Sequence, residues 1–223
     1  MKLNNLLTLT WKKFGIIIIA WVVSVILHNA FYAIFGIEEA IFFLIATVIL
    51  PVYLTASLIY TFIKFLIKKK TNWKILGFSF ILIILTAFIG SQFTSTNTGT
   101  EWYESIKPSI TPPNYVFPIA WNILFFLIAL SLYFTYVNSK TKKQRTKTLY
   151  LFGANFILNI LWSSIFFALQ KPAWAFLELI FLWISILLLT IHTYKIDKKA
   201  SIMLWPYLAW VTFAGILNYL SAF

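Results

Sequence analysis

The 223-residue sequence has no cysteine, only two histidines and only six acidic residues. The absence of cysteine excludes disulfides, thiolate nucleophiles and cysteine-based metal sites. Because His28 and His192 stand far apart in the sequence, a histidine-rich metal site is not expected either. Charged residues form 11% of the chain, whereas soluble domains contain about a quarter. This shortage of charge excludes a soluble globular domain.

Apolar residues make up 61% of the chain, and aromatic residues make up 20%. A helix that crosses the hydrocarbon core of a bilayer needs about 20 mostly apolar residues. Runs such as residues 80–85 do not alternate between apolar and polar types, as the strands of a membrane β-barrel would. The sequence therefore predicts an all-α integral membrane protein with seven spans, at 14–35, 40–63, 73–93, 117–137, 149–169, 173–194 and 201–223.

The net charge of +12 is distributed unevenly between the loops. Sixteen of the 18 lysines and arginines lie before the first span or between spans two and three, four and five, and six and seven. Only Lys107 and Lys171 lie on the opposite side. Since cytoplasmic loops are enriched in lysine and arginine, we expect a cytoplasmic N-terminus and an outer C-terminus. The charge is thus a topology signal, and no nucleic-acid partner is expected.

The first span extends over about 22 residues, longer than the apolar region of a signal peptide, and lacks a small-residue cleavage site, so we interpret it as a retained helix. The polar segment 67–72 separates the first two spans from the other five. We therefore predict an N-terminal two-helix membrane extension at 1–70 and a five-helix domain at 71–223. The sequence shows no internal repeat, so an inverted-repeat transporter is not indicated.

One connection, residues 94–116, is much longer than the others and lies on the outer side. It contains Trp102, Tyr103 and three prolines, two of which are Pro112 and Pro113, shortly before the fourth span. Proline restricts its own backbone and that of the residue before it, which stiffens the loop. Long ordered loops are often functional, so this segment is either a lid over the helices or a plain connection.

Three predicted spans carry faces that combine aromatic, small and amide side chains. Amides deep in a bilayer are costly unless they are hydrogen-bonded, so the two asparagines of the fifth span either join helices or line a cavity. Together the three faces fit a pocket for a large, flat, apolar ligand. At helical spacing the faces are Trp121 with Phe125; Asn155, Asn159, Trp162 and Phe166; and Trp210, Ala214, Leu217 and Asn218.

Trp162, Trp183 and Trp210 lie too deep in their spans for the interfacial belt in which membrane tryptophans usually occur. An indole N–H at such depth needs a partner, so each is either a helix-packing residue or part of a site. Glu178 is an acidic residue inside a span, near its outer end, where water can reach a side chain. A structural and a functional role are both open for Glu178.

Several short motifs follow one another along the last five spans. They are Gly90-Ser-Gln-Phe-Thr94, Trp102-Tyr103, Lys107-Pro108, Pro112-Pro113, Tyr115-Val-Phe-Pro118, Trp121, Leu158-Asn159, Trp162-Ser163, Phe166-Phe167, Trp174-Ala175, Pro206-Tyr-Leu-Ala-Trp210, Phe213-Ala214 and Leu217-Asn218. Each motif alone is weak, but in this order they resemble the TspO/MBR family over about residues 73–223. Its members are also called translocator protein, peripheral benzodiazepine receptor or tryptophan-rich sensory protein.

The resemblance implies a five-helix bundle, usually a homodimer, whose cavity is closed by the long loop between its first two helices. It implies binding of porphyrins such as protoporphyrin IX or haem, of benzodiazepine-type drugs and, in animal members, of cholesterol, with no cofactor required. Counterparts of Trp121 and Trp210 are linked in the family to light-dependent porphyrin breakdown, which would make these two the catalytic residues. The implied ligand-binding residues are Tyr103, Pro113, Trp121, Phe125, Asn155, Asn159, Trp210 and Ala214, to which the face of the fifth span adds Trp162.

Two features depart from the family. The segment 1–70 matches nothing in it. Tyr219 is not followed by the basic residue that the animal cholesterol motif requires, so this motif supports no claim about a sterol ligand.

We expect a membrane protein that binds porphyrins, other tetrapyrroles or similar flat apolar ligands in sensing, transport or photo-oxidative breakdown. The alternatives are a light- and oxygen-dependent porphyrin-degrading enzyme and a small-molecule transporter. A retinal protein is excluded because the last span has no lysine for a Schiff base. The expected partners are the lipid bilayer, a porphyrin-like small molecule and a second copy of the chain. The lysine- and isoleucine-rich composition suggests the cell membrane of a microbe.

Overall fold

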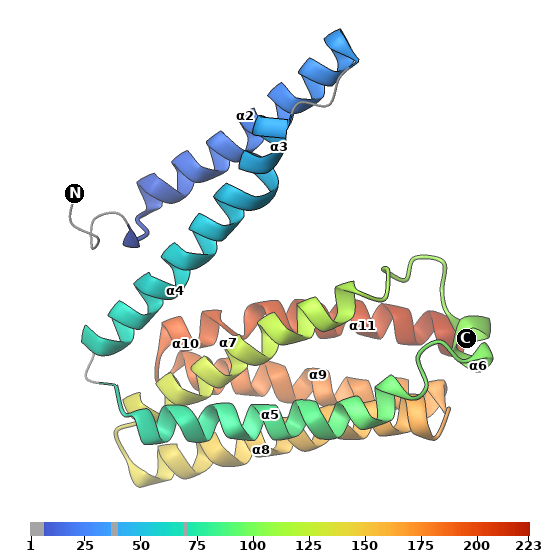
Figure 1. The fold of residues 1–223 in the computed structure, drawn as a ribbon. Coiled ribbons are helices and arrows are strands. Elements are labelled where there is room, and N and C mark those ends of the chain that lie inside the picture. The colour runs from blue at the N-terminus through green and yellow to red at the C-terminus, as the bar shows by residue number, and fades with distance from the viewer. Residues whose placement is uncertain (1–6, 37–39, 69–70) are drawn as a thin grey trace. The chain divides into compact units, whose positions relative to one another are not determined.

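The structure, a computed structural model, describes residues 7–36, 40–68 and 71–223 (Figure 1). Within these ranges every regular element is helical, and seven helices are long and apolar enough to cross a membrane. The predicted all-α membrane architecture is thereby confirmed. The chain divides into two compact units, Met1–Thr71 and Asn72–Phe223. The expected boundary at residue 70, with the charges of Lys69 and Lys70, lies outside the described residues.

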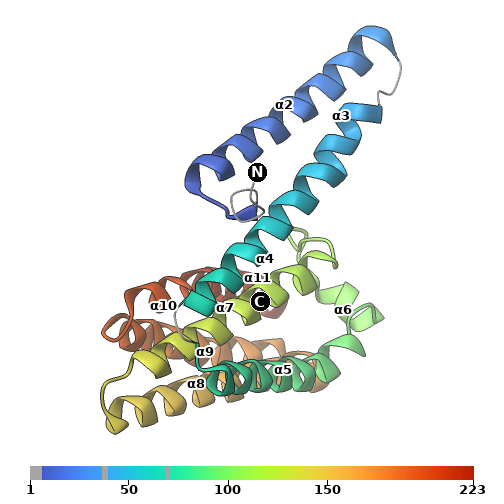
Figure 2. The same ribbon diagram turned by 60° about the vertical axis from the view of Figure 1, so that its left-hand side comes forward.

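The first unit is a helical hairpin (Figures 1 and 2). Helix α2 (Trp11–Phe35) packs along a second rod formed by α3 (Ala40–Leu44), the π-helix η1 (Ile45–Ile49) and α4 (Leu50–Lys68). Both rods are apolar enough to lie in a bilayer over most of their length. The span predicted at 40–63 is therefore helical, but a π turn interrupts its regular α-helical geometry.

Local interactions define the hairpin. The Thr10 hydroxyl accepts a hydrogen bond from the backbone N–H of Lys13 and caps the start of α2. Gly36 ends α2 in the left-handed region, at φ +67°, where a Cβ atom would be strained. The Trp21 indole N–H donates to the Ala46 carbonyl at 3.1 Å, at the π turn of the other rod. An indole inside a bilayer thus obtains the partner it needs.

The second unit contains five long helices and two short ones. Their bounds are α5 Trp73–Ser95, α6 Glu101–Ile106, α7 Val116–Asn138, α8 Lys142–Ser163 continued by the π-helix η2 Ser164–Ala168, α9 Pro172–Tyr194, α10 Lys198–Ile202 and α11 Trp205–Ala222. Helix α5 packs against α7 and α8, and α9 packs against α8 and α11. The five long helices thus form a ring, which the contact between α7 and α11 completes (Figures 1 and 2). This last contact is the loosest of the ring.

Side chains at the helix starts set these bounds. Asn72 caps α5, and Thr141 forms a reciprocal capping box with Gln144 at the start of α8. Pro172 occupies the first position of α9, where a missing backbone N–H costs nothing. The Asp197 carboxylate accepts from the backbone N–H groups of two residues in the first turn of α10.

The core of the second unit is apolar, and its members come from every long helix. Gly215 allows α11 to approach α9 closely, because a Cβ at this position would lie 3.1 Å from Cδ2 of Leu179. The core residues are Ile83, Leu124, Ile128, Ala129, Leu132, Phe152, Phe156, Leu179, Leu182, Ile186, Leu189, Leu204, Tyr207 and Val211.

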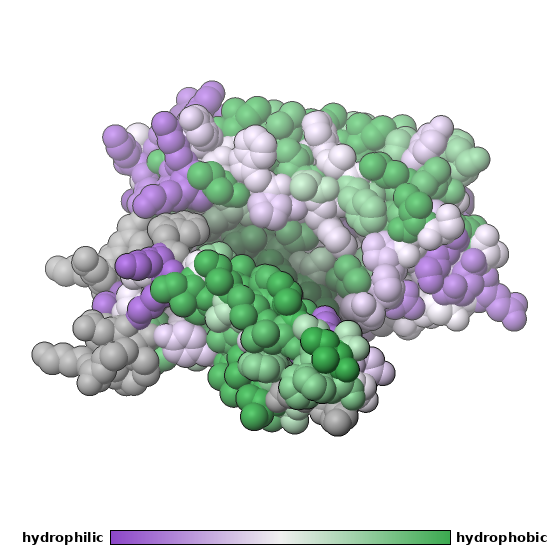
Figure 3. Space-filling model, turned by 90° about the horizontal axis from the view of Figure 1, so that it is seen from above, coloured by the Kyte–Doolittle hydropathy of each residue, from purple (hydrophilic) through white to green (hydrophobic). Residues whose placement is uncertain are grey.

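Large apolar side chains also cover the outside of the helices, as expected where lipid is the solvent. On α5 the exposed positions include Ile81, Ile84, Leu85 and Phe88. In the view of Figure 3, hydrophilic side chains gather toward the two ends of the second unit, and apolar ones occupy the length between them. This distribution fits helices that cross a membrane.

Two predicted segments differ from the structure in detail. The long loop begins later than expected, after Ser95, and it contains the short helix α6. Thr100 caps α6. The carboxylates of Glu101 and Glu104 lie in its first turn, where negative charge stabilises the positive end of the helix dipole. The last predicted span is broken into α10 and α11 by a turn before Pro206, since proline is tolerated only in the first turn of a helix.

Candidate functional site

The two asparagines of α8 belong to a buried polar network at the centre of the bundle. Asn159 donates through Nδ2 to the Tyr207 hydroxyl at 3.2 Å, and Tyr207 donates to Oδ1 of Asn155 at 3.3 Å. Asn155 donates through Nδ2 to Oγ of Ser185 at 2.8 Å, which joins α8 to both α11 and α9. Asn155 and Tyr207 have almost no exposed surface, so these amides hold helices together.

Trp162 forms a second polar connection, nearer the end of the bundle that carries the long loop. Its indole N–H donates to Oδ1 of Asn218 at 3.0 Å, and Nδ2 of Asn218 donates to the Pro172 carbonyl at 2.8 Å. The Trp162 ring stacks on Phe166, with centroids 5.4 Å apart. The π-helix η2 shifts the register, so that the consecutive residues Phe166 and Phe167 are both buried here.

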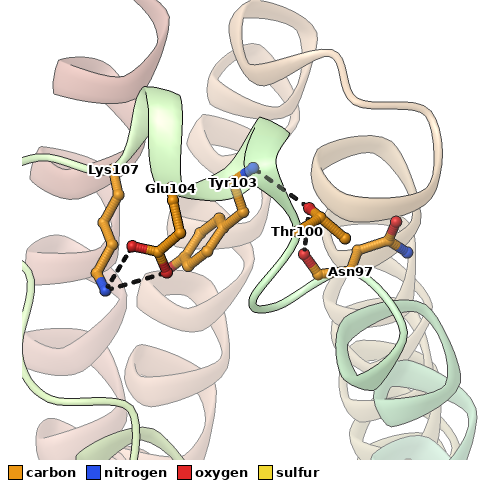
Figure 4. A network of polar contacts seen from close by, with 5 residues as sticks. All are labelled: Asn97, Thr100, Tyr103, Glu104 and Lys107. Atoms are coloured by element: carbon orange, nitrogen blue, oxygen red, sulfur yellow. Dashed lines mark hydrogen bonds and ion pairs between the residues drawn. The ribbon is translucent and has the colours of Figure 1, made fainter.

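Tyr103 attaches α6 to this aromatic cluster. Its ring lies 5.8 Å from Phe167, and its side chain is buried. Figure 4 shows how the loop around it is ordered: the backbone N–H of Tyr103 donates to the Thr100 hydroxyl, and Lys107 pairs with Glu104 at 3.4 Å. Burial raises the pKa of the Tyr103 phenol, and the neighbouring Glu104 carboxylate raises this pKa further. The phenol therefore stays neutral and anchors the loop.

A third group of aromatic side chains fills the wide contact between α7 and α11. Phe117, Trp121 and Phe125 follow one another at i, i+4 and i+8 on α7. Phe117 meets Trp210 edge-on at 5.9 Å, and Trp121 meets Tyr207 edge-on at 6.2 Å. Trp121 also lies 5.1 Å from Phe125. We call this group the α7–α11 aromatic gap; Ala214 packs beside it against the core.

The deep tryptophans differ in whether their indole N–H is used. Trp162 donates to Asn218, and Trp183 donates to the Thr212 hydroxyl at 2.8 Å. In the part of the chain that the structure describes, neither Trp121 nor Trp210 has a hydrogen-bond partner for its indole N–H. Both of these side chains are only partly buried. The α7–α11 aromatic gap thus offers two unpaired donors beside several aromatic faces.

The structure separates the predicted site residues into three neighbouring places. Asn155 and Asn159 meet at Tyr207, Tyr103 and Trp162 meet at Phe166 and Phe167, and Trp121, Phe125 and Trp210 lie in or beside the gap. Pro113 is exposed, and its carbonyl accepts from the backbone N–H of Val116 in the turn that starts α7.

Tyr207 and Phe117 are the residues that sequence reasoning missed. Tyr207 links the polar network to the gap, since it bonds both asparagines and touches Trp121. A signal for each was present: Tyr207 precedes Trp210 by three residues, and Phe117 precedes Trp121 by four, so each pair shares a helix face.

Glu178 is more enclosed than its position near the end of a span suggested. It is 9% exposed, and neither carboxyl oxygen has a hydrogen-bond partner among the described residues. On α9 it lies seven residues before Ser185, on the same face that contacts the polar network. The Glu178 carboxyl is therefore enclosed by protein side chains.

Comparison with known proteins relates the second unit to one family. A sequence model of the TspO/MBR family matches residues 79–222. The tryptophan-rich protein TspO of Archaeoglobus fulgidus is 39% identical over 142 residues, which cover 63% of this chain and 90% of that protein. The translocator protein of Homo sapiens is 31% identical over 138 residues, or 60% of this chain and 80% of that protein. The tryptophan-rich sensory protein of Cereibacter sphaeroides is 30% identical over 120 residues, or 53% and 73%.

Proposed function

The chain belongs to the TspO/MBR family of integral membrane proteins, and on this basis we propose that its α7–α11 aromatic gap binds porphyrins or similar flat, apolar ligands. Sensing, transport and photo-oxidative breakdown of the ligand all begin with this step. Protoporphyrin IX and its iron complex haem are the ligands to test first, and their binding requires no further cofactor. The protein acts as a homodimer in the lipid bilayer.

The unpaired indoles of Trp121 and Trp210 are the observation that carries the proposal. All four deep tryptophans of the second unit are partly buried, but Trp162 and Trp183 donate their indole N–H to a neighbouring helix, whereas Trp121 and Trp210 have no such bond among the described residues. Pockets for apolar ligands combine aromatic walls with a few polar groups that orient the ligand. A porphyrin supplies both matching features, a wide conjugated face and carboxylate groups that accept hydrogen bonds.

The long loop completes the proposed site as a lid. Tyr103 fixes α6 to the aromatic cluster on η2, and Pro113 begins the turn that leads into α7 and the gap. The rings of the gap contact one another, so a ligand enters as these side chains and the lid move apart. Asn155 has no exposed surface, and it contacts a ligand only after such a movement.

A porphyrin titration of the purified full-length protein tests the proposal. Binding shifts the Soret band of protoporphyrin IX and quenches tryptophan fluorescence. Ala214→Leu narrows the space beside Trp210 and is expected to weaken affinity about tenfold, which corresponds to about 1.4 kcal/mol. Ala209→Leu, an exposed position on the same helix, is the matched control and keeps wild-type affinity. Unchanged spectra at micromolar porphyrin would overturn the proposal.

The same unpaired indoles favour a second function, degradation of the bound porphyrin with dioxygen as the oxidant and light as the energy source. An indole against the ligand face is a redox partner for an excited porphyrin. Trp121→Phe with Trp210→Phe preserves flat aromatic faces but removes both N–H donors. Binding therefore survives with lower affinity, while light-dependent loss of the Soret band stops at saturating porphyrin. Equal breakdown rates in wild type and double variant reject the enzymatic function and leave binding as the activity.

The positive-inside distribution of lysine supports a cytoplasmic N-terminus and an outer C-terminus. Because the chain has no cysteine, a single introduced cysteine shows by its labelling on which side of the membrane it lies. Thr98→Cys in the long loop should react with a membrane-impermeant maleimide in intact cells. Lys143→Cys should react only after the cells are opened, and the reverse pattern would refute this orientation.

A further inference from the structure

The second unit has a groove far from the α7–α11 aromatic gap. It lies between the N-terminal turns of α5 and α8 and the C-terminal turns of α7, which pack together here. We call this end of the bundle the basic end, because Lys74, Arg145 and the lysines between residues 139 and 142 and between residues 195 and 199 lie there. The groove has a volume of about 180 Å³ and is lined by Lys74, Ile75, Phe78, Ser79, Leu132, Tyr136 and Leu149.

Polar and apolar side chains of the groove lie at different depths. Lys74 and Tyr136 lie within a turn of the helix ends, at the mouth of the groove. Phe78, Leu132 and Leu149 lie one turn further along α5, α7 and α8, toward the middle of the bundle. The groove is therefore polar at its mouth and apolar at its floor, as the boundary between headgroups and acyl chains is.

Two cations flank the mouth without a carboxylate to neutralise them. Lys74 lines it on the α5 side, and the Arg145 guanidinium lies 5.7 Å from the centroid of the Tyr136 ring on the α8 side. Neither cation forms an ion pair within the described ranges. The acidic residue at this end, Asp197, is already used, because it caps α10 and accepts a hydrogen bond from Asn138.

We infer that this groove binds an anionic phospholipid, with the phosphate between Lys74 and Arg145 and one acyl chain against Phe78, Leu132 and Leu149. Basic pockets between transmembrane helices are suited to anionic headgroups, because charge and hydrogen bonding act together there. A free phosphate would use the two cations but would leave the apolar floor unoccupied. This site is independent of the proposed porphyrin site.

A second depression at the same end provides a control. It is wider, about 510 Å³, and open to solvent, and it lies along the neighbouring face of α8. Its lining contains three lysines and, unlike that of the groove, no side chain from a second helix: Lys142, Lys143, Thr146, Lys147, Tyr150 and Leu151. Charge alone would draw an anionic lipid to this depression as well as to the groove.

Native mass spectrometry of the full-length protein, released from mild detergent, tests the inference. The protein is titrated with phosphatidylglycerol or with phosphatidylcholine of the same acyl chains. The inference expects selective retention of one phosphatidylglycerol molecule. Lys74→Gln with Arg145→Gln weakens this retention at least tenfold, whereas Lys142→Gln with Lys143→Gln, which removes the same charge, changes it less than twofold. Equal losses in the two pairs overturn the inference, since they indicate general attraction by charge.

A second pair of variants tests the apolar floor and leaves every charge in place. Leu149→Trp fills the groove and should reduce retention as strongly as the charge variant. Ile157→Trp, an exposed position on the same helix, is its control and should have no effect. Displacement of the lipid by excess glycerol phosphate, or unchanged retention in Leu149→Trp, contradicts a lipid site and indicates an anion site only.

Discussion

The contacts that α11 makes on its two sides contrast with each other. Toward α8 and α9, the polar side chains Asn155, Asn159 and Tyr207 satisfy one another. Toward α7, rings fill a wider contact, and the Trp121 and Trp210 indoles stay unpaired. A bilayer penalises unpaired polar groups, so the satisfied first contact is structural, and the unpaired indoles of the second contact are the reason we propose a ligand site there. Tyr207 belongs to both.

Truncating the shared residue should have the largest effect. Tyr207→Ala removes a buried ring and the hydrogen bonds of Asn155 Oδ1 and Asn159 Nδ2 to the hydroxyl, so we expect a loss of roughly 3–5 kcal/mol in unfolding free energy. Unfolding in mixed detergent micelles with increasing denaturing detergent measures this loss. Phe117→Ala, in the partly exposed gap, is the comparison and should cost less. Equal losses would show that the two contacts of α11 contribute equally to the unfolding free energy, against our expectation.

Exchanging tryptophans for phenylalanine should separate the two contacts more finely. Trp162→Phe leaves Oδ1 of Asn218 without a donor, and we expect a loss of about 1 kcal/mol in stability with little change in porphyrin affinity. Trp121→Phe removes no hydrogen bond, so its stability loss should be smaller, while the spectrum of bound porphyrin should change. The same unfolding assay and Soret spectra measure both. A larger stability loss for Trp121→Phe would contradict the assignment.

The smallest effect should be the contribution of the Tyr103 phenol to the pH dependence of stability. Because the pKa of Tyr103 is raised in the folded state, the folded protein holds this proton more tightly than the unfolded chain. The contribution is fully present below the ordinary tyrosine pKa of about 10 and is lost as pH rises through the raised value. Stability measured between neutral and strongly alkaline pH should fall less steeply for Tyr103→Phe. An identical fall in both proteins would show that the phenol does not anchor the loop.

The sequence predicted the parts of the fold that depend on the solvent. The seven spans could be read from apolar length alone, because lipid demands that length. The α6 helix could not, since it depends on one cap at Thr100 and on the docking of Tyr103 against η2. The faces with Trp121, Asn159 and Trp210 were recognised from helical spacing. How the faces meet depends on packing between helices, so the bridging role of Tyr207 emerged only from the structure.

Two features within the spans could not be predicted from the spacing of apolar and polar residues. The π turn at Phe166 and Phe167 shifts the register of one helix, and apolar sequence on both sides conceals it. Burial of Glu178 could not be predicted either, because its position near the end of a span is compatible with water as well as with protein. Both depend on neighbouring helices and not on the local sequence.

Indole resonances test the account most directly. In protein labelled with ¹⁵N-tryptophan, single tryptophan-to-phenylalanine variants assign the N–H signals of Trp121, Trp162, Trp183 and Trp210. The ring current of a porphyrin shifts protons that lie against its face. Adding protoporphyrin IX should therefore move the Trp121 and Trp210 signals strongly and leave those of Trp162 and Trp183 in place. Equal movement of all four signals, or movement of Trp162 and Trp183 alone, would contradict a ligand site in the α7–α11 aromatic gap.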